Sequence, residues 1–116
     1  MKRIVKAFFN SLAALRWGFR NEAALREEMV ILALSFPAAL LLTSDPWRLL
    51  LLWGVLALLL AVELLNTGIE KLADRVTTDS DDLIRIAKDC GSAAVLMLAL
   101  ISGGAWSLAF WERVFG

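Results

Sequence analysis

Three carboxylates and one amide fall on a single helical stripe in the middle of this 116-residue chain. Glu63, Asn66, Glu70 and Asp74 are separated by three, four and four residues, which places them on one face of a helix with 3.6 residues per turn. Carboxylates stacked one turn apart can hold a divalent cation. A carboxylate that is partly shielded from water can also serve as a general base.

The position of Glu63 makes this stripe unusual. Glu63 directly follows an apolar run, Leu49 to Val62, whose composition is that of a membrane helix. A carboxylate at lipid depth costs roughly 3 kcal/mol on insertion scales, so its presence there needs a reason. The spacing alone fits two interpretations equally well, a chemical site and a polar seam between the helices of a bundle.

Length and composition indicate a single membrane-embedded domain over residues 1–116. Hydrophobic residues make up 59% of the chain and the mean hydropathy is +0.69, both above the values usual for soluble proteins. The absence of His excludes imidazole metal sites and His-based catalytic triads, and the single Cys excludes an intramolecular disulfide. Neither a P-loop nor a protein-kinase signature is present.

The hydrophobic pattern predicts an all-α fold, with a surface helix followed by three membrane helices. In residues 1–20 the Phe and Leu side chains share one face and most Lys and Arg side chains the opposite face. This pattern is typical of a helix that lies on an anionic membrane surface; the alternative is a soluble amphipathic helix packed on a core. Membrane helices are expected at about 26–44, 48–74 and 83–112. Only the third, uncharged over 90–111, clearly exceeds the length needed to cross a bilayer, about 20 residues.

Residues that typically cap or interrupt helices predict how these helices are connected. We expect Asn21 to cap the second helix, with Glu22 in its first turn, where the helix dipole favours an acid. Pro37 is expected to kink that helix. Residues 75–85, which include two Thr and a run of Asp and Ser, are expected to form a loop.

The placement of charge predicts where the chemistry lies. Ten of the twelve Lys and Arg residues fall within 1–28 or 63–89, and three crossings put these two segments on the same side. The positive-inside rule makes that side cytoplasmic, together with the N-terminus, and leaves the C-terminus periplasmic. The acidic stripe, Glu22 and the Lys88-Asp89 pair share that side. The residues alone therefore predict a metal or cation site at the cytoplasmic membrane face, suited to phosphate held through a divalent metal.

Three blocks of the sequence resemble the prokaryotic diacylglycerol kinase family. They are NEAALREE at 21–28, VELLNTGIEKLADR at 62–75 and RIAKDCGSAAVL at 85–96, and the resemblance extends over nearly the whole chain. It implies a homotrimeric kinase of the bacterial inner membrane, with active sites shared between neighbouring protomers. It also implies that ATP, together with Mg²⁺, phosphorylates diacylglycerol to phosphatidic acid, with membrane lipids as partners and no nucleic acid.

The resemblance also implies roles for individual residues. Glu63 would be the general base, with Asn66 and Lys88 as further catalytic residues, and Glu22 and Glu70 would bind the Mg²⁺. The residues expected to bind ATP and its metal are Arg3, Asn10, Glu22, Glu70, Asp79, Ser80, Asp81, Lys88 and Asp89, and those expected to contact the lipid are Glu28, Glu63 and Ser92. The chain departs from the family at Asn10, where members carry an aromatic residue, and at Leu12, where they carry Trp.

Other interpretations stay open at this point. Glu63 could be a neutral acid hydrogen-bonded across a helix pair, and Asp74 could simply pair with Arg75 or Lys71. Arg3 could be an anchor for lipid phosphates. For the whole protein, the alternatives are an undecaprenol kinase and, from another class, a non-enzymatic membrane subunit or cation pathway.

Overall fold

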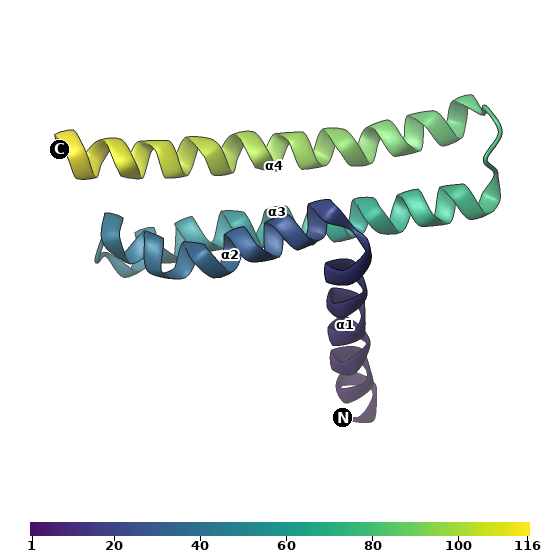
Figure 1. The fold of residues 1–116 in the computed structure, drawn as a ribbon, viewed down its shortest axis with the longest axis horizontal. Coiled ribbons are helices and arrows are strands. Elements are labelled where there is room, and N and C mark those ends of the chain that lie inside the picture. Colours follow the sequence, from purple (N-terminus) through teal and green to yellow (C-terminus); the bar gives the residue numbers. More distant parts are fainter.

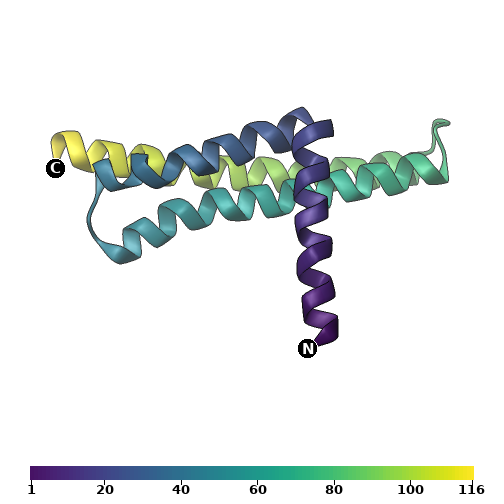
Figure 2. The ribbon, with the colours of Figure 1, turned by 60° about the horizontal axis from the view of Figure 1, so that its bottom comes forward.

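The computed structural model describes all 116 residues as four α-helices without strands, which confirms the all-α prediction. The helices are α1 (Lys2–Asn21), α2 (Ala23–Leu42), α3 (Pro46–Val76) and α4 (Asp82–Phe115). The helices α2, α3 and α4 run side by side, with α3 and α4 the two long ones, whereas α1 leaves them at a steep angle near the start of α2 (Figures 1 and 2). α3 is the central helix, because it packs on both α2 and α4.

The surface of this fold is largely apolar. Only 13 of the 116 residues are buried, and large side chains such as Leu41, Leu100 and Phe110 are exposed. α3 and α4 are each long and apolar enough to cross a membrane. α2 has 20 residues, but its first turns carry three charges at 26–28, so its apolar part is shorter. The exposed apolar surface and the two long helices together indicate a membrane protein.

A single residue separates α1 from α2. Glu22 has an extended backbone, with φ −123° and ψ 116°, and it is the N-cap residue of α2. The prediction that Asn21 caps α2 is therefore wrong: Asn21 is the last residue of α1, and its side-chain amide donates to the carbonyl of Trp17 at 2.9 Å, a local bond that short amide side chains form readily. At this bend Gly18 faces Leu25 so closely that a Cβ would stand 2.6 Å from the Leu25 Cδ1.

Side chains of α3 and α4 donate hydrogen bonds across the helix interfaces. Trp53 donates to the carbonyl of Ser35, Ser102 to that of Val55, and Trp106 to that of Leu52, at distances between 3.0 and 3.2 Å. Polar groups at membrane depth find no water, so each of these bonds satisfies a donor that lipid could not. Such bonds between membrane helices contribute about 0.6 kcal/mol on average.

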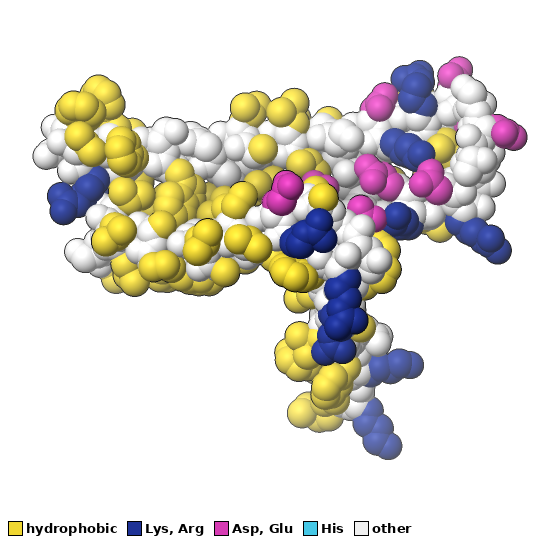
Figure 3. Space-filling view, viewed as in Figure 1, with side chains coloured by type: hydrophobic (Ala, Val, Ile, Leu, Met, Phe, Trp, Pro, Cys, Tyr) yellow, Lys and Arg dark blue, Asp and Glu magenta, His cyan; other side chains and the backbone are white.

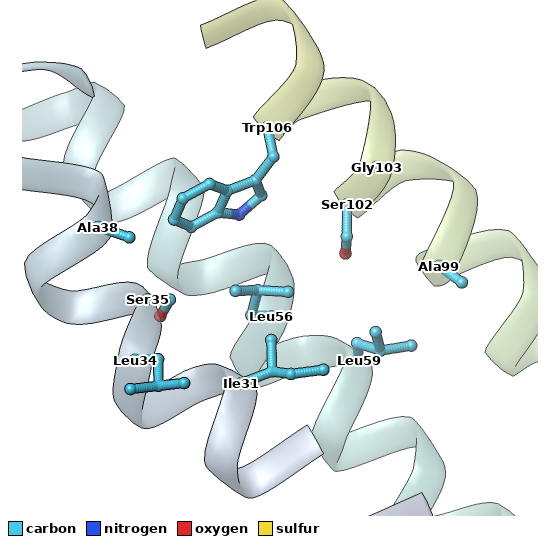
Figure 4. Close-up of a pocket in the computed structure, with 10 residues that line it drawn as sticks. All are labelled: Ile31, Leu34, Ser35, Ala38, Leu56, Leu59, Ala99, Ser102, Gly103 and Trp106. Carbon is cyan, nitrogen blue, oxygen red and sulfur yellow. The ribbon is translucent and has the colours of Figure 1, made fainter. Parts of the chain in front are cut away.

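An apolar cavity of about 450 Å³ lies between α2, α3 and α4. Its lining residues are Ile31, Leu34, Ser35, Ala38, Leu56, Leu59, Ala99, Ser102, Gly103 and Trp106 (Figure 4). Seven of these ten residues are hydrophobic, so the cavity suits an apolar occupant.

The connection between α3 and α4 is short. Because α3 continues to Val76 and α4 begins at Asp82, only residues 77–81 are outside a helix, fewer than the expected loop at 75–85. Asp81 fixes the start of α4, since its carboxylate accepts a hydrogen bond from the backbone N–H of Ile84 at 3.0 Å. α2 continues through Pro37.

Candidate active site

Acidic side chains are concentrated in one part of the molecule. Figure 3 shows Asp and Glu where α1 meets the long helices and along the adjoining ends of α3 and α4, while hydrophobic side chains cover the surface beyond. Glu63 and the three carboxylates within electrostatic range of it, those of Glu22, Glu28 and Glu70, are here called the acid cluster. They therefore lie where the apolar and polar parts of the bundle meet.

The stripe predicted on α3 forms the buried part of this region. Glu63 and Asn66 are only 9% and 7% exposed. The Asn66 side-chain amide donates to Glu70 Oε1 at 3.3 Å, whereas Asn66 Oδ1 is buried without a hydrogen-bond partner. Gly91 of α4 packs directly on this side chain, because a Cβ at position 91 would collide with Asn66 Oδ1. The close approach of α4 therefore holds Asn66 in place.

Two further carboxylates come from the bend and from α2. Glu22 Oε1 accepts from the Lys71 ammonium at 2.9 Å. The carboxylate of Glu63 lies within electrostatic range of Glu22 and Glu70, and also of Glu28. Glu28 Oε2 is buried without a hydrogen-bond partner. The bend, α2 and α3 thus bring four acids together, although the sequence separates them by up to 48 residues.

A second polar region lies further along α3 and α4, beside the connecting loop. A cavity of about 300 Å³ is lined there by Asp79, Ser80, Asp81, Asp82, Ile84, Arg85, Lys88 and Asp89. Arg85 pairs with Asp89 at 3.3 Å and with Asp82 at 3.9 Å. This loop cavity contains both signs of charge, so it suits a polar, charged ligand rather than a lipid tail.

Asp74 joins the two polar regions. Its carboxylate accepts from the Lys88 ammonium at 2.7 Å, so its ion-pair partner is Lys88 rather than Arg75 or Lys71, although Lys71 also lies within electrostatic range. The apolar run of α3 ends at Val62, and the polar groups here lie beyond it. The ion pair of Lys88 with Asp74 therefore joins α4 to α3, as the pair of Lys71 with Glu22 joins α3 to the bend.

Three of the predicted site residues belong to neither the acid cluster nor the loop cavity. Arg3 and Asn10 are exposed on α1, whose N-terminal half projects away from the long helices (Figure 1). Ser92 is exposed on α4, directly after Gly91. Within one copy of the chain, none of these three forms a hydrogen bond or an ion pair with the carboxylates.

Lys71 is the residue that sequence reasoning did not assign to the site. Helical spacing reveals contacts within one helix, whereas Lys71 reaches from α3 to Glu22 at the bend. Its ammonium also lies 5.6 Å from the ring centroid of Trp17 on α1. No pattern in the sequence of α3 indicates either contact.

The oxygen donors of the acid cluster fit a magnesium ion that arrives with phosphate. No three Asp, Glu, His or Cys residues form a group that could hold a metal by themselves. Mg²⁺ is usually held by one or two carboxylates, with water and phosphate oxygens completing its coordination. Glu22 and Glu70 offer two carboxylates, and Asn66 Oδ1 is a buried oxygen without a donor. The donor set therefore fits Mg²⁺ bound together with a nucleotide.

Fold and site together define a small helical membrane protein with an acid-rich polar site at one end of an apolar bundle. Residues 9–110 match the model of the family described as prokaryotic diacylglycerol kinase. The chain belongs to this family, as its three sequence blocks predicted. It is therefore an enzyme of the kinase class, and the alternative of a non-enzymatic subunit or cation pathway is not favoured.

Curated relatives cover nearly the whole chain. The chain is 38% identical over 111 residues to the diacylglycerol kinase of Escherichia coli strain K12, covering 96% of this chain and 91% of that protein. It is 37% identical over 107 residues to the diacylglycerol kinase of Pseudomonas aeruginosa, covering 92% and 87%. The diacylglycerol kinase of Haemophilus influenzae is 34% identical over 96 residues, covering 83% and 81%.

Proposed function

We propose that the protein transfers the γ-phosphoryl group of ATP to diacylglycerol, giving phosphatidic acid and ADP at the cytoplasmic face of the bacterial inner membrane. The curated names of its relatives support this pair of substrates. The observation that carries the proposal is the place of Glu63, which is buried where the apolar run of α3 gives way to the acid cluster. A base at that depth meets the hydroxyl of a lipid that stays in the membrane.

The proposed reaction is a direct in-line transfer. Glu63 takes the proton from the primary hydroxyl of the lipid as that oxygen bonds to the γ-phosphorus. The bond from the γ-phosphorus to the bridging oxygen breaks, and that oxygen leaves on ADP with the electron pair. Asn66, which donates to Glu70, keeps the Glu70 carboxylate in a fixed position relative to Glu63. No side chain forms a bond to phosphorus, so no phosphoenzyme is expected.

The nucleotide is proposed to lie between the acid cluster and the loop cavity. Glu22 and Glu70 would hold the Mg²⁺, which supplies charge neutralisation to the phosphates when it is bound. Lys88 offsets further phosphate charge as a compact cation, and its pair with Asp74 places it between the two regions. Around it, Asp79, Ser80, Asp81 and Asp89 line the loop cavity, which is large enough to take part of a nucleotide.

The lipid is proposed to extend from the acid cluster into the apolar cavity. Ile31 follows Glu28 by three residues, and Leu59 precedes Glu63 by four, so α2 and α3 each lead from an acid to the cavity wall within about one turn. An acyl chain in this cavity would leave the hydroxyl near Glu63. Glu28 and Ser92 are proposed to face the headgroup.

We further propose three crossings and a homotrimer with shared active sites. The exposed apolar side chains of the long helices leave ample surface for neighbouring copies as well as for lipid. Arg3 and Asn10 belong to the N-terminal half of α1, which projects away from the other helices (Figure 2), so any contact of theirs with the nucleotide would involve a neighbouring copy.

The test is Glu63→Gln in the full chain purified in detergent. The change keeps the size of the side chain and removes the base, so diacylglycerol-dependent phosphate transfer should fall by about 10²- to 10⁴-fold. Light scattering should give the mass of a trimer for both proteins. Glu27→Gln is the matched control, because Glu27 is exposed and forms no ion pair.

Two comparisons complete this experiment. Omitting Mg²⁺ should abolish transfer, and undecaprenol offered beside diacylglycerol separates the two lipid kinases. Near-normal transfer by Glu63→Gln would reject Glu63 as the base.

A further inference from the structure

Lys71 contacts the acid cluster at Glu22 and has no role in the reaction proposed above. Its ammonium donates to Glu22 Oε1 at 2.9 Å, and it is also within electrostatic range of Glu70 and Asp74. Two of these three acids, Glu22 and Glu70, are the proposed metal ligands. An ammonium at this place neutralises part of the negative charge that the fold gathers there.

The ion pair of Lys71 with Glu22 joins α3 to the bend, and Trp17 of α1 also lies close to the ammonium. The Lys71 side chain is 57% exposed, so it could extend into water, yet its ammonium faces the bend between α1 and α2. The ring centroid of Trp17 on α1 lies 5.6 Å from Nζ, a distance at which the ring attracts a cation. Glu22 and Trp17 together therefore favour this one position of the ammonium.

We propose that Lys71 is an internal counter-ion that occupies the cation position at Glu22 and leaves that carboxylate when the divalent metal binds. This inference rests on the proposed metal site, because it concerns the same carboxylate. Two cations on one carboxylate repel each other, so the metal binds to Glu22 only when the Lys71 ammonium has left it. The fraction of protein in which the pair is formed then lowers the apparent affinity for the metal.

The pair also distinguishes a free metal ion from one that carries a nucleotide. A free ion displaces Lys71 without providing it with a new partner. A metal–nucleotide complex brings phosphate oxygens, which are acceptors for the released ammonium. Lys71 thus weakens the binding of metal alone more than the binding of metal with ATP.

The experiment titrates Mn²⁺ alone into the full chain in detergent, without nucleotide or lipid, and follows free Mn²⁺ by electron paramagnetic resonance. Lys71→Met should bind Mn²⁺ about threefold more tightly, because an exposed ion pair is worth at most about a factor of five. Lys71→Arg keeps the cation and should not bind more tightly than the unchanged protein. Arg75→Met removes a charge one turn away that forms no ion pair, and its shift should be clearly smaller.

Thermal unfolding provides a second measurement, made once with a chelator and once with saturating Mn²⁺. With a chelator present, Lys71→Met should unfold at a lower temperature than the unchanged protein, because the acids lose their counter-ion. Saturating Mn²⁺ should remove most of this difference. A purely structural role for Lys71 would lower the unfolding temperature equally in both arms, and that result would overturn the proposal.

The remaining outcomes separate the two proposals. Unchanged or weaker Mn²⁺ binding by Lys71→Met, with normal binding by the unchanged protein, overturns the role of Lys71 and leaves the metal site standing. If neither protein binds Mn²⁺, the metal site at Glu22 and the role of Lys71 are both wrong.

Discussion

The polar and charged residues at the two ends of the helical bundle differ in whether they have partners. Four charged residues lie at the end far from the acid cluster, and each has a partner. Arg48 pairs with Glu112, Arg113 donates to the carbonyl of Leu41 at 3.2 Å, and Asp45 accepts from the backbone N–H of Arg48 at 3.2 Å. These contacts cap helices and join their ends.

At the acid cluster, by contrast, polar groups are buried without partners. Glu28 Oε2 and Asn66 Oδ1 both lack a hydrogen bond, and the Glu63 carboxylate lies near other carboxylates. An unpartnered buried polar atom costs about 1–3 kcal/mol. Such atoms are expected where a fold retains groups for a ligand rather than for stability. The comparison therefore distinguishes charged groups that join the helices from polar groups that are available to bind a ligand.

The largest expected difference is between Glu70→Gln and Glu112→Gln, one acid from each end. Glu70→Gln removes a proposed metal ligand, so activity at fixed Mg²⁺ should fall by about 10- to 100-fold and recover in part at higher Mg²⁺. Glu112→Gln should leave activity and its Mg²⁺ dependence unchanged. The measurement is phosphate transfer across a Mg²⁺ series, and equal losses in both variants would remove the distinction between the two ends.

The next effect concerns Gly91, where α4 approaches Asn66. Gly91→Ala should displace the Asn66 side chain and lengthen its bond to Glu70, so activity should fall by about tenfold. Stability should fall by no more than about 1–3 kcal/mol, the usual range for overpacking. Gly104→Ala is the control, because a Cβ at position 104 meets nothing within 4 Å and Gly104 does not line the apolar cavity. Transfer assays and thermal unfolding check both variants, and a fully active Gly91→Ala would show that Asn66 needs no fixed position.

The smallest effect is expected at the far end. A double-mutant cycle with Arg48→Met and Glu112→Gln should give a coupling of about 0–1 kcal/mol in unfolding, because both side chains are about half exposed. Phosphate transfer should stay normal in all three variants. A loss of transfer here would show that the far end also takes part in the reaction.

Contacts within one helix could be predicted from the sequence. The spacing of Glu63, Asn66 and Glu70 predicted one face, and the bond from Asn66 to Glu70 shows that two of them do meet one turn apart. The all-α fold and the family followed from hydrophobic pattern and sequence blocks. These features depend on neighbours a few residues away, which a linear pattern records.

Contacts between helices could not be predicted in this way. Lys71 meets Glu22 and Lys88 meets Asp74, although 49 and 14 residues separate them. Both pairs depend on where one helix crosses or follows another. The cap of α2 was missed for a local reason: Asn21 bonds back onto its own helix, and α1 therefore continues one residue further than its polar sequence indicates.

The one-residue bend at Glu22 has a mechanical consequence. The backbone that sets the angle between α1 and α2 also carries a proposed metal ligand, with no spacer to absorb a change. A change in the angle of α1 is therefore expected to move that carboxylate directly. An extra amino acid inserted here should make the position of the carboxylate independent of that angle.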